Sequence, residues 1–125
     1  MATTYHIYVV CPVRLGISKE ATEYVKKLEE RGYKVYYPPR DAPQDDDTGM
    51  NIIISEREAI VNCREVHVFY DARSQGIHFD LGMAFMLNKP IKFIEILVSK
   101  DKNYPSHGEK TYVRALEQYR QEHKS

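Results

Sequence analysis

Apolar residues fall in short runs along the chain, separated by polar and turn-forming segments. The runs are rich in β-branched and aromatic residues, which favour buried strands. Four strands are predicted in this way, over Thr4–Cys11, Tyr33–Tyr37, Val66–Tyr70 and Ile91–Leu97. The first run is almost unbroken at its end, which is typical of a central parallel strand covered on both faces.

Between the first two runs, the apolar residues follow the period of a helix. Ser18 is a suitable N-cap, and Gly32 suits the left-handed residue that ends a helix. The apolar residues at the spacing of one helical face are Ala21, Tyr24, Val25 and Leu28. This segment is therefore predicted to be an amphipathic helix packed on the sheet.

A second helix is predicted from about Met50 to Cys63. Its expected buried residues are Ile53, Ala59 and Ile60. Its expected exposed residues are Glu56, Arg57 and Glu58. The run of isoleucines near its start is also typical of a strand, so the pattern does not fix where this helix begins.

The segment before this helix, Arg40–Gly49, is polar and rich in turn-forming residues. It follows Pro38 and Pro39, which lack amide donors and are expected to end the second strand. It is long enough to act as a flap over a site. Its acidic run, Asp45–Asp47, is interpreted as solvated acids near the positive end of the helix, with magnesium ligands as the alternative.

A third helix is predicted between the last two strands. It follows the loop Asp71–Gly76, runs from about Ile77 to Leu87, and ends at Asn88 before Pro90. A strand, a helix and a strand in this order imply two parallel strands with a right-handed connection. Ligands of such sheets bind beyond the carboxyl ends of the strands, which is where this loop lies.

A closing helix is predicted after Ser106–Glu109, which has the pattern of a capping box. The residues along its apolar stripe are Tyr112, Val113, Leu116 and Tyr119. Alternating strands and helices predict an α/β fold, a small flavodoxin-like or Rossmann-like three-layer sandwich with a parallel sheet of about four to five strands. Residues 1–125 are expected to form one domain, because a chain of this length is too short for two ordinary ones.

Composition narrows the classes of partner. A formal net charge of zero argues against a surface for a nucleic acid polymer, which needs clustered excess Lys and Arg. No apolar run is long enough to span a membrane, so we expect no membrane partner. The two cysteines, Cys11 and Cys63, have no CxxC spacing and favour a reducing, cytoplasmic location. The ten tyrosines suit a ligand pocket or a subunit interface, or the edge of a small core.

Three loops are expected to meet at one edge of the sheet: Cys11–Ile17, Arg40–Gly49 and Asp71–Gly76. Ser74 and Gly76 lie at a predicted helix start, where free amides and the helix dipole favour an anion. Arg14 and Gly16 offer further contacts from the loop after the first strand. These residues predict a phosphate site, although an ordinary helix cap has the same pattern.

Asp80 is the strongest candidate for chemistry, because it interrupts a helix that is otherwise largely apolar. It is either exposed to solvent or held at a functional edge. His78 is expected nearby as a proton donor or ligand contact, or as a half-buried residue at the helix start. Cys11 has no fixed His and Asn partners and is interpreted as a packing residue. No cofactor is expected, and no spacing of His, Cys and Asp predicts a zinc site.

Two motifs resemble the nucleoside 2-deoxyribosyltransferase family and its nucleoside 5′-monophosphate N-glycosidase relatives. Ile7–Gly16 resembles the opening strand of the family, with its tyrosine and glycine-containing turn. Ser74–Ala84 is similar to the family's run of Gly, three residues, Glu, Leu, Gly, any residue and Ala, and Lys89-Pro90 follows before the next strand. The order of elements agrees over about residues 5–97.

This resemblance implies roles for individual residues. Asp80 takes the position of the catalytic Glu that attacks the anomeric carbon, and Tyr8 that of the tyrosine that orients the carboxylate. Ser74 and Gly76 match phosphate contacts of the monophosphate hydrolases. The family commonly completes its pocket with a neighbouring subunit, so the resemblance also implies a homodimer or larger assembly.

Three positions depart from the family. Asp80 is one methylene shorter than Glu, and Pro12 replaces a small or hydroxyl-bearing residue. Arg57 aligns best with an Asp that the family's preceding helix offers to the base or sugar, and Arg cannot accept a hydrogen bond.

Three functions therefore remain open. The first is an N-glycosidase or deoxyribosyltransferase acting on a nucleoside or nucleoside monophosphate. The second is a non-catalytic nucleotide-binding protein on the same scaffold. The third is a module resembling response regulators or TIR domains that works through protein contacts, with Tyr36 and Tyr37 as surface anchors.

Overall fold

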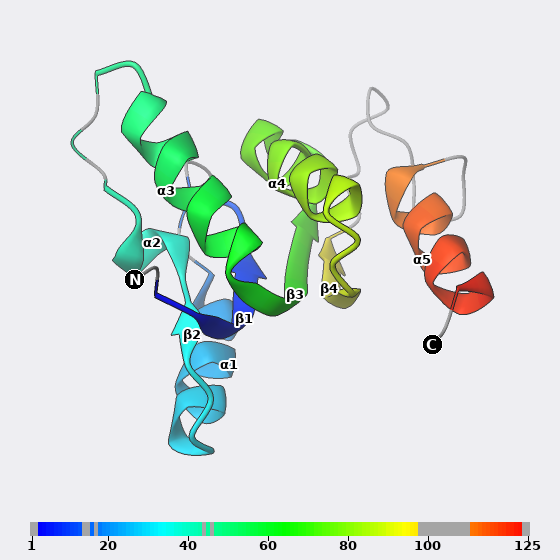
Figure 1. Cartoon of the computed structure of the whole chain (residues 1–125), viewed down its shortest axis with the longest axis horizontal. Coiled ribbons are helices and arrows are strands. Elements are labelled where there is room, and N and C mark those ends of the chain that lie inside the picture. Colours follow the sequence, from blue (N-terminus) through cyan, green and yellow to red (C-terminus); the bar gives the residue numbers. More distant parts are fainter. Residues whose placement is uncertain are drawn as a thin grey trace.

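The computed structural model describes residues 3–13, 16, 18–43, 45, 47–97 and 111–123. Figure 1 shows the order of the elements along the chain. The strands are β1 (Tyr5–Val10), β2 (Val35–Tyr36), β3 (Cys63–Asp71) and β4 (Ile91–Leu97). The helices are α1 (Lys19–Glu30), α2 (Pro38–Asp41), α3 (Met50–Val61), α4 (Gln75–Met86) and α5 (Tyr112–Glu122).

The four strands form one sheet in the order β2-β1-β3-β4, and all neighbouring pairs are parallel. Helix α1 packs on one face of the sheet, whereas α3 and α4 lie side by side on the other (Figure 1). The predicted α/β fold with a parallel sheet between helical layers is therefore confirmed. The strand number lies within the predicted range of four to five.

Two apolar cores hold these layers together because successive strand residues point to opposite faces. The larger core lies between the sheet and helices α3, α4 and α5; its fully buried side chains include Tyr8, Ile60, Val66, Val68 and Ile77. The smaller core joins α1 to the other face through Val9, Val25, Leu28 and Phe69. The central strands β1 and β3 supply residues to both cores, as their nearly continuous apolar runs predicted.

The ends of two helices follow their predicted signals. The Ser18 hydroxyl accepts a hydrogen bond from the Ala21 amide at 3.1 Å and caps α1. After α1, Gly32 takes a φ of 92°, and after α4, Asn88 takes a φ of 56°. Both conformations lie in the left-handed region that ends helices, so these stop signals are confirmed.

A hydrogen-bond chain ties α1 to the third strand. The Tyr24 hydroxyl lies 2.6 Å from His67 Nδ1, and His67 Nε2 lies 2.7 Å from a Glu65 carboxylate oxygen. His67 is buried, and burial lowers its pKa below the ordinary value by disfavouring the imidazolium. Both ring nitrogens have partners, so this histidine fixes the position of α1 on the sheet.

The segment after β2 differs from its prediction. Pro38–Asp41 forms the short helix α2, where the sequence indicated a strand end followed by a loop. Proline fits the first helical positions because the amides there have no partner within the helix. Arg40 stabilises this turn, since its guanidinium donates hydrogen bonds to the Glu29 carboxylate at 2.8 Å and to the Val35 carbonyl at 3.1 Å.

The burial of two α3 residues also differs from its prediction. Ile53 was expected to be buried, but it is 44% exposed. Glu56 was expected to be exposed, but it is half-buried and interacts with Asp80 on α4. Ala59 and Ile60 are buried as predicted. Ile53, Glu56 and Ile60 lie along one side of the helix, and this side is buried at Ile60 but not at Ile53, two turns earlier.

Helix α5 begins after Thr111, whose hydroxyl accepts a hydrogen bond from the Arg114 amide at 3.2 Å. Its residue Val113 is buried in the larger core, and Leu116 packs against that core. The predicted capping box at Ser106–Glu109 lies outside the described residues. No helix in the described parts of the chain is both long and apolar enough to cross a membrane.

Candidate active site

The candidate site lies where the chain changes direction across the sheet. From β1 the chain moves to β2 on one side, and it later returns to β3 on the other side. The carboxyl ends of parallel strands lie at the same edge, so the loops after β1, β2 and β3 leave that edge next to one another. Such a switch point is the usual place for a ligand in an open α/β sheet.

Tyr8 and Asp80 meet beneath this edge. The Tyr8 hydroxyl donates a hydrogen bond to Asp80 Oδ2 at 3.0 Å, although the two residues lie far apart in the sequence. Tyr8 is fully buried and Asp80 is 5% exposed. Asp80 points inward because it shares the buried side of α4 with Ile77, Leu81 and Ala84. The expected contact between Tyr8 and Asp80 is therefore present, and the exposed position for Asp80 is excluded.

Glu56 on α3 completes this cluster and lies close enough to Asp80 for the two carboxyl groups to interact. Two carboxyl groups can share a hydrogen bond only when one of them carries a proton. Asp80 Oδ1 is buried and has no hydrogen-bond partner within the described residues, so it is the oxygen available for such a bond. Burial first, and then the contact with Glu56, raises the pKa of Asp80 well above its ordinary value.

Tyr8 and Cys11, which lie near the two acids, are buried and stay protonated at neutral pH. Burial, followed by the nearby Asp80, raises the pKa of Tyr8 well above its ordinary value. The same causes raise the pKa of Cys11 to about 12. Cys11 is therefore a thiol at neutral pH, in agreement with its interpretation as a packing residue. Tyr8 remains a hydrogen-bond donor to Asp80 across the physiological pH range.

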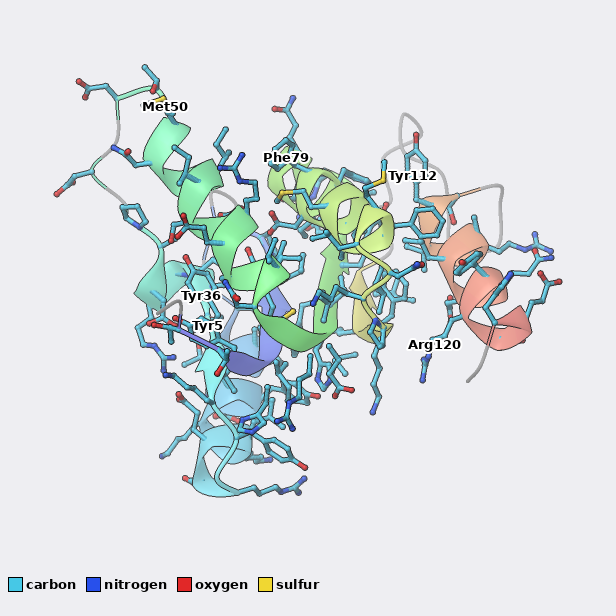
Figure 2. All side chains as sticks on the ribbon, viewed as in Figure 1. Tyr5, Tyr36, Met50, Phe79, Tyr112 and Arg120 are labelled. Carbon is cyan, nitrogen blue, oxygen red and sulfur yellow. The ribbon has the colours of Figure 1, made fainter. Side chains whose placement is uncertain are left out.

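Tyr36 forms one wall of the cluster. Its ring stacks on that of Tyr8, with centroids 5.1 Å apart and planes 10° from parallel. Its hydroxyl lies 2.7 Å from the Ser55 hydroxyl on α3. Figure 2 shows Tyr36 and Tyr5 beside each other at the strand edge. Both Tyr36 and Tyr37 are buried, so the prediction that they are surface anchors is wrong.

The loop after β3 is held by a buried acid. Asp71 accepts hydrogen bonds from the Arg73 guanidinium at 3.0 and 2.6 Å and from the Arg73 amide at 3.0 Å. The Arg73 hydrogen bonds lower the pKa of Asp71 below its ordinary value. Ser74 then caps α4, because its hydroxyl accepts a hydrogen bond from the Ile77 amide at 3.2 Å. Gly76 is exposed in the first turn of the helix.

His78 is not brought to the two acids. Its Nδ1 lies 2.8 Å from the Ser74 carbonyl oxygen, and its Nε2 lies 2.9 Å from the Tyr70 hydroxyl. The ring also makes an edge contact with Tyr112 on α5. A carbonyl oxygen only accepts, so Nδ1 donates to the Ser74 carbonyl, and Nε2 is paired with the Tyr70 hydroxyl. Both nitrogens are occupied on the side of α4 that faces α5.

Three further residues were predicted to contact a ligand, namely Gly16, Arg14 and Arg57. Gly16 follows β1 with a φ of 103°, which suits glycine, and it is exposed at the expected edge. Arg14 lies outside the described residues. Arg57 is exposed on α3, next in sequence to the residue that reaches Asp80. The α3 residue in contact with Asp80 is therefore Glu56, which sequence reasoning missed.

A signal for Glu56 was present in the sequence. Ala59 and Ile60 were predicted to be buried, and Glu56 precedes them by the spacings that place residues on one helical face. A carboxylate on a buried helical face is uncommon unless it has a partner.

Two surface grooves lie away from the two acids. One is lined by residues of α4, β4 and α5, including Phe85, Ile91 and Tyr119. The other runs along the β2 edge and includes Tyr36 and Ser55, which adjoin the cluster. Neither groove is lined by Asp80 or Tyr8. The expected hollow over Asp80 is not one of these grooves, and residues 14, 15, 17, 44 and 46 of the neighbouring loops lie outside the described residues.

Within the described residues, no group of three or more His, Cys, Asp and Glu side chains is arranged to hold a metal ion. Among the residues that the structure describes at the switch point, two carboxyl groups and a phenol are brought together. The chain matches no protein-family model, and the comparison with curated proteins finds no significant match.

Proposed function

We propose that this protein cleaves the bond between base and sugar in a nucleoside or nucleoside 5′-monophosphate, as an N-glycosidase or a deoxyribosyltransferase. One observation carries the proposal: buried Asp80 pairs with half-buried Glu56 and accepts a hydrogen bond from Tyr8. Two carboxyl groups brought together out of water are costly to build and are typical of acid–base and nucleophilic sites. Its position at the switch point of the sheet favours a ligand-binding role.

The chemistry of this pair suits a glycosidic bond. Such a bond breaks through a transition state in which positive charge develops on the sugar ring. A carboxylate beneath the ring stabilises that charge or captures the anomeric carbon. Apolar walls strengthen this interaction, because the effective dielectric constant is low in a site that excludes water.

The second acid also removes one departure from the family that the sequence resembles. Arg57 aligns best with the family's Asp near the base or sugar, but Arg cannot accept a hydrogen bond. Glu56 interacts with Asp80, so the helix before β3 supplies a carboxyl group next to the aligned position. The departures at positions 57 and 80 favour the non-catalytic alternative; Glu56 removes the first of them, and the shorter Asp80 remains.

The start of α4 is the proposed phosphate subsite. Ser74 caps the helix, and Gly76 lies exposed in its first turn, where backbone amides favour an anion. Gly16 lies in the loop after β1, the strand next to β3. Arg14 is proposed as a further contact from the sequence alone.

The test is an assay of base release. The protein is incubated with a panel of 2′-deoxynucleosides, ribonucleosides and their 5′-monophosphates, and free base is measured by chromatography. We expect release from at least one substrate, reduced on the order of a thousandfold in Asp80→Ala. Glu23→Ala is the matched control, because Glu23 is an exposed acid on α1, on the other face of the sheet, and it is expected to retain full activity.

Other outcomes separate the alternatives. Thermal stabilisation by nucleotides without any base release would support the non-catalytic binder. The absence of both would contradict a nucleotide site altogether. Equal activity of wild type and Asp80→Ala would show that the carboxyl pair does not carry the reaction.

We also propose a homodimer or larger assembly. The outer surfaces of α3 and α4 carry exposed apolar side chains, namely Met50, Ile53, Ile54, Val61, Phe79 and Met86. Figure 2 shows Met50 and Phe79 on these two helices, away from the sheet. An apolar surface across adjacent helices is typical of a protein interface.

We propose a cytoplasmic location as well. Cys11 and Cys63 are free and buried, which agrees with a reducing compartment.

Sedimentation equilibrium tests this assembly. Ile53→Glu is expected to shift the protein from dimer to monomer, because it places a charge in the apolar surface. Lys26→Glu changes an exposed residue of α1 and is expected to leave the assembly unchanged. A wild-type protein that is monomeric at high micromolar concentration would contradict the proposal.

A further inference from the structure

The geometry of the carboxyl pair distinguishes its two members. Asp80 is the more buried of the two acids: it is 5% exposed, and its Oδ2 accepts the hydrogen bond from Tyr8. Its Oδ1 is buried and receives no donor from the described residues. Glu56 is half-buried, and its side chain is one methylene longer. The arrangement is a chain of three groups, with Tyr8 at the buried end and Glu56 at the end nearer to solvent.

A protonated Asp80 satisfies every atom of this chain. Oδ2 then acts as the carbonyl-like oxygen that accepts from Tyr8, and Oδ1 carries the proton and donates it to Glu56. With the proton on Glu56 instead, the Asp80 carboxylate would be a buried charge with Tyr8 and Glu56 as its donors. Placing the negative charge on the more exposed of two acids costs less, because water solvates it better.

We propose that Glu56 is the carboxylate that attacks the anomeric carbon, and that Asp80 is a protonated positioning residue that holds Glu56 through Oδ1. This assignment rests on the proposed function. It moves the nucleophilic role that the sequence motif implied for Asp80 on α4 to Glu56 on α3. This assignment accounts for the shorter side chain of Asp80, since a residue that only orients its neighbour does not need to reach the sugar.

The reaction balances with water as the second substrate. A Glu56 oxygen forms a bond to the anomeric carbon, and the carbon–nitrogen bond breaks with its electron pair moving to the base nitrogen. That nitrogen takes a proton from water, which leaves hydroxide. Hydroxide then bonds to the anomeric carbon, and the carbon–Glu56 oxygen bond breaks with its electron pair returning to the carboxylate. The proton on Asp80 stays in place throughout.

Two amide variants separate the roles of the acids. Asn at position 80 copies protonated Asp, because its carbonyl oxygen accepts from Tyr8 and its amide donates to Glu56. Asp80→Asn is therefore expected to retain activity within about tenfold of wild type, since one altered hydrogen bond is worth about 1 kcal/mol. Glu56→Gln removes the nucleophile and is expected to lower kcat on the order of a thousandfold or more. The opposite ranking of the two variants would overturn the assignment.

A covalent trap identifies the attacking oxygen directly. A 2′-deoxy-2′-fluoroarabino nucleoside slows the breakdown of a glycosyl ester by disfavouring positive charge on the ring. After incubation with the active wild-type enzyme and digestion, mass spectrometry is expected to place the added sugar on the peptide that contains Glu56. A sugar on the peptide that contains Asp80 would contradict the proposal.

A readout without substrate keeps the assignment testable if the proposed function fails. In protein labelled with ¹³C at aspartate side-chain carboxyls, the Asp80 signal is the one missing from Asp80→Asn. We expect this signal at the position of a protonated acid at pH 7, and we expect Tyr8→Phe to shift it. A signal typical of a carboxylate at pH 7 would overturn the positioning role. Absent base release together with a protonated Asp80 would reject the reaction and, with it, the attack by Glu56.

Discussion

Replacing Ile60 with alanine is expected to lower the free energy of unfolding by about 3 kcal/mol. Ile60 is fully buried, on the side of α3 that packs into the larger core. Truncation removes three buried carbons and leaves a cavity that the surrounding strands and α4 cannot fill completely. For a chain of this length, such a loss lowers the melting temperature by roughly 10 °C.

The matched control for this prediction is Ile53→Ala. It makes the same chemical change on the same helix, but Ile53 is 44% exposed. At a protein concentration below that of the proposed assembly, its cost is expected to stay below about 1 kcal/mol, because a half-exposed side chain loses little burial when it is truncated. Denaturant unfolding of both variants measures the difference. Equal losses of stability from the two variants would mean that both isoleucines face the core, as the sequence pattern predicted.

Tyr8→Phe is expected to weaken both stability and base release. The change removes the only hydroxyl that bonds Asp80 Oδ2 within the described residues. Leaving a buried acceptor without its donor costs about 1–3 kcal/mol of stability. The Tyr8 bond also acts to lower the pKa of Asp80, so its loss raises that pKa further. A misplaced carboxyl pair is expected to reduce kcat about tenfold to a hundredfold.

Tyr37→Phe provides the comparison for Tyr8→Phe. Tyr37 is also buried, and its hydroxyl lies 2.9 Å from the Thr22 hydroxyl, in the core on the α1 side of the sheet. Its loss removes one buried hydrogen bond without touching Asp80 or Glu56. We expect a loss of about 1 kcal/mol in stability with unchanged kcat. Equal losses of activity in the two variants would show that Tyr8 acts only through stability.

The strands and the helix caps could be predicted from the sequence because their signals are local. Val, Ile and Tyr in nearly continuous runs specify the buried strands β1 and β3. Ser18 and Ser74 cap their helices through bonds to amides three residues away, which depend on no other part of the chain. Strands and caps that depend on such short-range interactions can be predicted without knowing the fold.

The extent of burial along α3 could not be read in the same way. Ile53 and Ile60 lie two turns apart on one side of the helix, and the apolar pattern does not state how far along that side the core extends. Contact with α4 and the sheet decides it: Ile60 is buried, Ile53 is 44% exposed, and Glu56 between them interacts with Asp80.

The sequence by itself determined the parallel α/β fold, the position of the Ser74 cap, and the choice of Asp80 and Tyr8 as partners. The first two follow from the period of the apolar residues and from local hydrogen bonding, and the third came from the resemblance of two motifs to a family. Only the tertiary structure decided that Asp80 lies beside a second acid and that His78 faces away from it. Those relations depend on how two helices pack on a sheet, and side chains from distant segments meet only after that packing is complete.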